Sequence, residues 1–195
     1  MGELKLKLKK IEILEQNPGT LNVLYWFFAY PEAKITLTEL AKKLVISKKT
    51  ASKVVKELAK EGFLVIEKIG KSWAIYCNPQ HIFNRTLKIG HNLSLIYSSG
   101  IIAEIYKKIG NPKAIILFGS YRKGDDIGKS DLDIAVEVIG KDEMKIINIG
   151  TISRLGYRKD VPVNLYVFSR SKIDSNMFAN IANGIVINGF LEARV

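Results

Sequence analysis

The sequence predicts a mixed protein on the border of the α+β and α/β classes, with two domains joined by a helical connector. Residues 18–78 show three helical patterns followed by two short strands, and from residue 111 onward apolar strands alternate with helices. The length of 195 residues suits two small domains. We therefore divide the chain into an arm (1–17), an N-terminal domain (18–78), a connector (79–110) and a C-terminal domain (111–195).

The composition is that of an ordinary soluble protein, with 47% hydrophobic and 25% charged residues. We expect no membrane span and no signal peptide, since the arm interrupts Leu4, Leu6 and Leu8 with lysines in a strand-like alternation. The single cysteine, Cys77, excludes an internal disulfide and favours a cytoplasmic location. The net charge of +11 fits either polyanionic and phosphorylated partners or a solvated lysine-rich surface.

The N-terminal domain reads as helix, helix, helix and hairpin. Residues 20–30 form a strongly apolar helix, whose Trp26, Phe27 and Phe28 belong to the core or, as the alternative, to a homodimer seam. Thr36 and Glu39 have capping-box spacing before a helix over 37–45. Ser47 caps a helix over 48–61, Gly62 ends it, and strands over 63–68 and 72–77 follow.

The third helix has two contrasting faces. Its buried stripe comprises Ala51, Val54, Val55 and Leu58, and the opposite face carries Lys48, Lys49, Ser52, Lys53 and Lys56. Such a helix can lie in a DNA major groove, while Lys68 and Lys71 near the hairpin tip reach neighbouring phosphates. Lysines favour phosphate contact over base reading.

ISKKTASKVVKELAKEGFLVIEK within this domain resembles the winged helix-turn-helix family of bacterial and archaeal regulators. The resemblance implies binding of DNA or another nucleic acid. Winged domains also serve as protein-interaction modules, so a protein partner remains open.

Beyond the hairpin, Asn78 and Pro79 predict the start of a long helix that reaches residue 109, with breaks near Gly90 and at 98–100. His81 and His91 within it are expected to pack. The C-terminal domain then reads as a sheet with helices on one face. The strands are expected at 114–118, 131–138 and 161–168, the helices at 144–156 and 171–182, and a closing segment at 184–190.

The strand over 114–118 runs into Gly119 and Ser120, where a turn and a helix start expose backbone N–H groups that favour a bound anion. Ser120 adds a hydroxyl donor, and Arg122 and Lys123 add positive charge. Asp131 and Asp133 then begin the next strand. Alternate strand residues face the same side, roughly 6.5–7 Å apart at Cα, so two carboxylates placed in this way can share divalent cations such as Mg²⁺.

GSYRKGDDIGKSDLDIAV resembles the nucleotidyltransferase fold of the DNA polymerase beta superfamily, in particular the minimal nucleotidyltransferases of archaea and bacteria. The matching positions are Gly119, Ser120, Gly124, Ser130, Asp131 and Asp133. The resemblance implies Mg²⁺ or Mn²⁺ on Asp131 and Asp133, and a nucleoside triphosphate bound by Gly119, Ser120, Arg122, Lys123 and Ser130.

One position departs from the family pattern. The third carboxylate, which helps the acceptor hydroxyl lose its proton, is replaced by Asn164 in the predicted strand over 161–168. Asp160 is a weak substitute, because four strand residues span about 13 Å. Asp125 and Asp126 read as solvated turn residues, and Tyr121 is expected either to stack on a base or to pack.

Two functions follow from this combination. The first is a metal-dependent enzyme that moves a nucleoside monophosphate to a nucleic-acid, small-molecule or protein hydroxyl, the last as in minimal nucleotidyltransferases paired with toxin partners. The second is a DNA-binding transcriptional regulator whose nucleotidyltransferase-like domain senses nucleotide or mediates dimerisation. The intact Asp131 and Asp133 favour the enzyme, and Asn164 favours the regulator. A third possibility is that the nucleotidyltransferase-like domain is a structural remnant without either activity.

Overall fold

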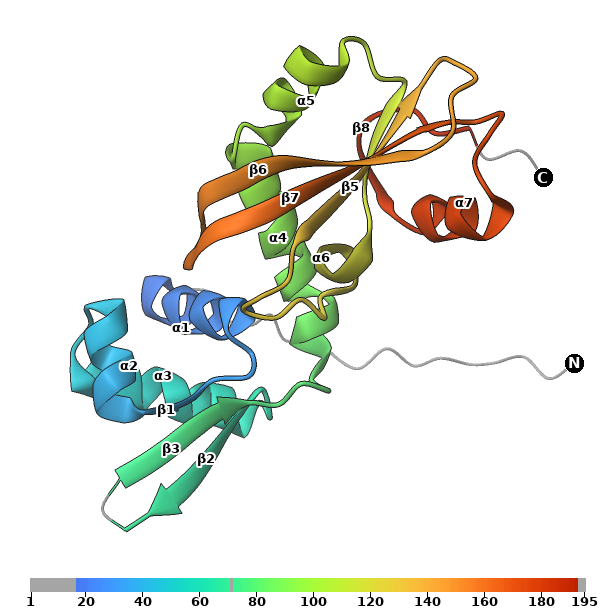
Figure 1. The fold of residues 1–195 in the computed structure, drawn as a ribbon. Coiled ribbons are helices and arrows are strands. Elements are labelled where there is room, and N and C mark those ends of the chain that lie inside the picture. Colours follow the sequence, from blue (N-terminus) through green and yellow to red (C-terminus); the bar gives the residue numbers. More distant parts are fainter. Residues whose placement is uncertain (1–16, 71, 193–195) are drawn as a thin grey trace, which may run out of the picture.

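The computed structural model describes residues 17–70 and 72–192 (Figure 1). The arm predicted to be strand-like and Lys71 lie outside these residues. An N-terminal domain is followed by helices that lead to a C-terminal sheet (Figure 1). Within the described part of the chain, no helix combines the length and the apolar character needed to cross a membrane.

The N-terminal domain has three helices and a small antiparallel sheet in the order β1-β3-β2. Its elements are α1 (Pro18–Ala29), β1 (Lys34–Thr36), α2 (Leu37–Leu44), α3 (Lys48–Lys60), β2 (Leu64–Ile69) and β3 (Ser72–Cys77). The predicted caps are confirmed. Thr36 and Glu39 form a reciprocal capping box, and the Ser47 hydroxyl accepts the Thr50 N–H at 3.0 Å. The strand β1 escaped prediction, since three residues are too short to show a period.

The core of this domain gathers aromatic and aliphatic side chains from α1, α2, α3 and the hairpin. Trp26, Phe27 and Phe28 are all buried, and Phe28 packs edge-on against Phe63. This confirms the core interpretation of the three aromatic residues.

Three helical segments connect the domains: η1 (Ile82–Arg85), α4 (Leu87–Ser98) and α5 (Ile101–Ile109). The expected start at Asn78 is wrong, because its side chain instead accepts the Gln80 N–H in a turn. The expected break at Gly90 is wrong too, since the Gly90 N–H keeps its helical bond to the Thr86 carbonyl. The break at 98–100 is confirmed, with Gly100 in the left-handed region at φ 78°.

The C-terminal domain is a mixed five-stranded sheet in the order β6-β7-β5-β4-β8, in which β5 and β7 are parallel and the other pairs antiparallel. Its elements are β4 (Ala114–Leu117), α6 (Gly119–Lys123), β5 (Leu132–Val138), β6 (Lys145–Leu155), β7 (Arg158–Ser169), α7 (Ser175–Ala182) and β8 (Ile185–Gly189).

The predicted helix over 144–156 is wrong, because this segment is strand β6, paired antiparallel with β7. Its isoleucines and Thr151 are β-branched, Gly150 has a φ of 107°, and Gly156 supplies a positive φ at the turn into β7. A hairpin therefore satisfies the backbone of β7 on its free side, and the apolar spacing that suggested a helix is incidental.

Helices cover both faces of the sheet, rather than one face as expected. Ile96, Ile101 and Ile105 from α4 and α5 pack on the face that carries Ile134 and Leu165. On the opposite face, α7 packs through Ile181 against residues that include Ile116, Ala135 and Phe168. The same face carries polar side chains at the start of β5 and beside it in the middle of β7, and these form the candidate site.

Candidate functional site

Asp131, Asp133 and Asn164 meet on one face of the sheet. Asp131 precedes β5 and Asp133 is its second residue, so the strand alternation turns both carboxylates to the same side. Asn164 is the Cα partner of Asp133 in the parallel neighbour β7. Its Nδ2 lies 3.2 Å from Asp131 Oδ2 and 3.5 Å from Asp133 Oδ1. The Asn164 position expected from the sequence is therefore beside the Asp pair.

A second asparagine, Asn148, fixes how this amide is oriented. It is the antiparallel partner of Asn164 in β6, and its Nδ2 donates to Asn164 Oδ1 at 3.2 Å. The amide oxygen of Asn164 thus faces Asn148, while its N–H groups face the acids. Sequence reasoning missed Asn148 because its segment was assigned to a helix.

Gly119 brings the backbone at the start of α6 close to Asp133. Its φ is 71°, and a Cβ placed on it would lie 2.8 Å from Asp133 Oδ2. Glycine is therefore required both for the left-handed conformation and for the close approach. The first N–H groups of a helix have no intrahelical acceptor, so α6 opens beside the acids with donors that suit an anion.

The pKa of Asp133 is raised above its ordinary value. Burial is the main cause, and the charge of Asp131 adds to it, while hydrogen bonds from Asn164 and Tyr166 act in the opposite direction. Tyr166 was not predicted. It lies two residues after Asn164 on the same face of β7, and its ring packs edge-on against Phe118 at 4.9 Å between centroids. The sequence signal that could have identified Tyr166 is its position two residues after Asn164, which places both side chains on the same face of a strand.

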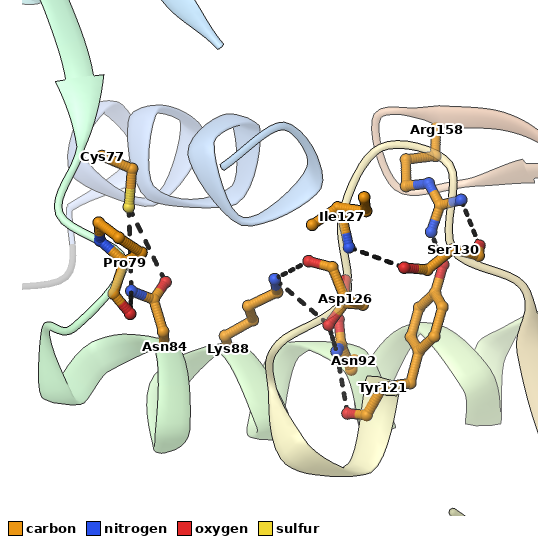
Figure 2. A network of polar contacts seen from close by, with 10 residues as sticks. All are labelled: Cys77, Pro79, Asn84, Lys88, Asn92, Tyr121, Asp126, Ile127, Ser130 and Arg158. Atoms are coloured by element: carbon orange, nitrogen blue, oxygen red, sulfur yellow. Dashed lines mark hydrogen bonds and ion pairs between the residues drawn. The ribbon is translucent and has the colours of Figure 1, made fainter. Parts of the chain in front are cut away.

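The loop that leads into Asp131 is held by the protein itself (Figure 2). Ser130 Oγ accepts the Ile127 N–H at 2.9 Å, and the Arg158 guanidinium donates to the Ser130 carbonyl and to the Tyr121 hydroxyl. The Ser130 hydroxyl thus has a structural contact in the loop, and its predicted contact with nucleotide stays a prediction. Tyr121 is only 2% exposed and packs, so base stacking is excluded for it.

Asp126 is buried, so the expectation of a solvated turn residue is wrong. Its side chain is 2% exposed, lies 3.3 Å from Lys88 Nζ and accepts Asn92 Nδ2 at 2.9 Å (Figure 2). Burial raises the pKa of Asp126 and lowers that of Lys88, although their mutual attraction opposes both changes. Asp125 is exposed, as expected.

Asp160 does not replace the missing acid. It is exposed and has a φ of 49°, which interrupts the regular alternation on which that idea depended. Within the described residues, no three His, Cys, Asp or Glu side chains form a group that could hold a metal ion. The acids of the site therefore number two.

Arg122 and Lys123 lie toward the other end of α6. They line a cavity of about 890 Å³ between the two domains, whose lining does not include Gly119, Ser120, Asp131, Asp133 or Asn164. Their predicted contact with triphosphate at the Gly119 turn stays a prediction.

The predicted nucleic-acid face of α3 has the expected arrangement. Ala51, Val54, Val55 and Leu58 are buried. The exposed lysines opposite are Lys48, Lys49, Lys53 and Lys56, with Lys68 on β2, whereas Ser52 is half-buried. Lys53 lies 3.9 Å from Glu57, and Lys56 stands over the Trp73 ring at 5.6 Å. His81 and His91 both pack against aromatic rings, as expected.

The two halves of the chain match two family models. Residues 101–188 match the model described as Polymerase beta, Nucleotidyltransferase, and residues 17–68 match the MarR family. No curated protein matches the chain. The first match begins at α5, inside the predicted connector, so the boundary drawn at residue 110 stays a prediction.

Proposed function

Because the chain joins an N-terminal MarR-type winged-helix domain to a polymerase beta nucleotidyltransferase domain, we propose that it is a metal-dependent nucleotidyltransferase that works with nucleic acid. The observation that carries this proposal is the meeting of Asp131, Asp133 and Asn164 beside the Gly119 turn. A domain kept only for its fold would have no requirement for two neighbouring acids at the start of β5, so the pair favours a function over a structural remnant.

The residues present fit a hard divalent cation. Two carboxylates share one face, and each accepts a hydrogen bond from the Asn164 amide. No Lys, Arg or His side chain of the described residues forms an ion pair with either of them, and hard oxygen ligands suit such a cation. Burial first, and the Asp131 charge after it, raise the pKa of Asp133, and a bound cation would favour the charged form of this carboxyl. Asp131 and Asp133 would hold Mg²⁺ or Mn²⁺, which when bound supplies neutralisation of charge on the phosphates.

The remaining tasks fall to the chain's own groups. The N–H groups at the start of α6 and the Ser120 hydroxyl bind phosphate oxygens of a nucleoside triphosphate. Asn164 holds both carboxylates in position through its amide hydrogens. An amide cannot take up a proton at neutral pH, so the acceptor hydroxyl lacks the help of a third carboxylate, and we expect slow transfer.

The test is label transfer from each nucleoside triphosphate, with Mg²⁺ or Mn²⁺, to oligonucleotides or to the protein itself. Asp133→Ala should reduce transfer to background without unfolding the protein. Asp125→Ala, which removes an exposed acid from the preceding loop, is the matched control and should leave transfer unchanged. Transfer that persists in Asp133→Ala would overturn the assignment.

The missing base gives a second test. Asn164→Asp restores a carboxylate at the third position, and a positioned general base typically contributes about 10²–10⁴-fold. We expect at least a tenfold gain in any transfer rate. An unchanged or lower rate would show that the Asn164 position does not assist the acceptor.

A second function is favoured by the Asn148–Asn164–Asp arrangement, in which amide hydrogens already occupy part of the acid face. In this case the domain senses nucleotide, and the winged domain binds DNA as a regulator. Absence of transfer, together with DNA binding that weakens steeply with salt, supports this alternative. Lys48→Gln and Lys53→Gln should each lower the salt slope by about one, whereas Lys108→Gln on α5 should not.

A further inference from the structure

We propose that the cavity between the two domains is a second binding site, separate from the acid face, for a small organic phosphate. Three parts of the chain form its walls. The winged domain supplies Lys34 and Tyr76, η1 and α4 supply Arg85 and Ile89, and α6 supplies Arg122 and Lys123. The volume of about 890 Å³ lies in the range, about 300–1,000 Å³, of sites for small molecules.

The charge of the lining favours an anion. Five basic and three acidic side chains line the cavity. Two of the basic side chains are already paired, Lys34 with Glu67 at 2.7 Å and Lys88 with Asp126 at 3.3 Å. Within the part of the chain that the structure describes, Arg85, Arg122 and Lys123 have no ion-pair partner. The acids Glu32 and Asp125 and the cations Arg85 and Lys123 are all exposed, so water screens both signs of charge at the rim, whereas Arg122 is half-buried. The three unpaired cations still outnumber the two unpaired acids.

The buried part of the cavity wall consists of polar side chains that hydrogen bonds hold in place. Lys88 is 1% exposed and Asn84 5%, and both side chains are held by the contacts drawn in Figure 2. Asn84 Nδ2 donates to the Asn78 carbonyl at 3.0 Å, and Lys88 Nζ donates to the Asp126 carbonyl. A site whose walls are already in place loses little entropy when a ligand binds.

The chemistry of the lining indicates an ester of phosphate rather than a bare ion. Tyr76, Ile89 and Ile127 offer apolar contact area beside the three unpaired cations. Arginine matches the oxygens of a phosphate through paired donors. A molecule that combines a phosphate with a sugar or a base would use both kinds of surface.

This site and the acid face are on different ends of α6. Gly119, at one end, contacts Asp133, whereas Arg122 and Lys123, toward the other, line the cavity. Since the unpaired cations outnumber the unpaired acids in the lining, binding of a phosphate there requires no metal ion. Binding also does not depend on the proposed transferase activity, and the two can fail independently.

The experiment is calorimetric titration of the full chain in EDTA with adenosine 5′-monophosphate, ribose 5-phosphate, inorganic phosphate and adenosine. We expect at least one phosphate ester to bind, and to bind more tightly than phosphate or adenosine alone. Arg85→Gln and Arg122→Gln should each weaken that binding about tenfold or more, since each removes charge-assisted hydrogen bonds. Lys108→Gln, an exposed lysine on α5, should change nothing.

Asp133→Asn separates this site from the first. It should leave the metal-free binding intact while abolishing metal-dependent binding of a nucleoside triphosphate. The proposal is overturned if neither ester binds in EDTA, if inorganic phosphate binds as well as the esters, or if Arg85→Gln and Arg122→Gln leave the affinity unchanged. It is also overturned if Asp133→Asn removes the metal-free binding, because the ligand would then occupy the acid face.

Discussion

Asp126 and Asp131 lie in one loop, yet the protein treats their carboxylates in opposite ways. Asp126 is buried beside Lys88 and Asn92, so its hydrogen-bonding and charge requirements are met inside the protein. Asp131 is exposed next to Asp133, and Asn164 brings only uncharged N–H donors to the two acids. The contrast teaches that the first acid ties its loop to helix α4, while the two acids of the pair have no cationic partner among the described residues.

The substitution with the largest expected effect on stability is Lys88→Met, which tests whether Asp126 depends on its buried partner. It leaves Asp126 buried without its cation, and the loss of one partner of a buried pair costs about 3–5 kcal/mol of unfolding free energy. Lys108→Met, at an exposed position on α5, should change stability by no more than about 0.5 kcal/mol. Urea unfolding measures both. A loss below about 1 kcal/mol in Lys88→Met would show that Asp126 does not need its partner, whereas adding Asp126→Asn should recover part of the loss.

Gly124→Ala tests the contact between the end of α6 and η1, where two backbone segments approach each other closely. Gly124 has a φ of 77°, and a Cβ there would lie 1.8 Å from the Asn84 carbonyl oxygen. The backbone must move, and we expect a loss of about 2–4 kcal/mol in urea unfolding. Gly90→Ala is the matched control, since open space surrounds that position in α4, and it should stabilise by about 0.5–1 kcal/mol. Equal effects of the two substitutions would contradict the tight contact.

His91 tests whether the contact between α4 and the winged domain also disfavours a charged side chain. Burial lowers its pKa to about 4, and its ring stacks on Tyr25 at 3.6 Å between centroids. Between pH 6.5, where the unfolded histidine is half-protonated, and about 4, the unfolded state binds more protons, so stability falls as the pH falls. The expected slope from this group is at most about 1.4 kcal/mol per pH unit.

His91→Phe keeps an aromatic ring at this position and removes the titration. Urea unfolding at several pH values should therefore give a shallower decline for the variant between about pH 6.5 and 4, with the two curves running parallel below about pH 4. Parallel curves across the whole range would show that His91 takes up its proton at the same pH in the folded and unfolded states, which would contradict the lowered pKa.

Asp131→Asn should have the smallest effect on stability, and of the opposite sign. In EDTA it removes one of two repelling charges, so the unfolding free energy should stay unchanged or rise by about 0.5–1 kcal/mol. If the proposed metal site exists, Mg²⁺ and a nucleoside triphosphate together are expected to raise the melting temperature of the wild type, and Asp131→Asn should lose this rise. A destabilisation above about 1 kcal/mol in EDTA would make Asp131 a structural acid like Asp126.

The parts of the site that the sequence predicted are those set by local geometry. Asp131 and Asp133 share a face because strand side chains alternate, and Asn164 was located from its place in the next apolar strand. The capping pair Thr36 and Glu39 needed only its spacing. The strand alternation and the capping spacing involve residues within a few positions of one another, where periodicity is informative, whereas the Asn164 position came from the family resemblance.

The parts that were missed depend on partners far along the chain. Lys88 and Asp126 are separated by 38 residues, so nothing near Asp126 shows that it is buried. Asn148 became part of the site only because β6 pairs with β7, and isoleucines in that segment also fit a helical spacing. Tyr166 acts through Asp133 of a neighbouring strand, and that neighbourhood is a property of the sheet order.

Glycines where the halves meet make those halves difficult to exchange. Gly124 lies against the Asn84 backbone, Gly128 against Tyr30 of the winged domain, and Gly156 against Leu95 of α4. An added Cβ would overlap the Asn84 carbonyl at the first place and would crowd the neighbouring side chain at the other two. A winged domain taken from another protein would have to fit against the rest of the chain without placing an additional methyl group at these contacts. Evolution of this chain is therefore expected to alter its two halves in step, and chimeras should fail at their junction before they fail in either core.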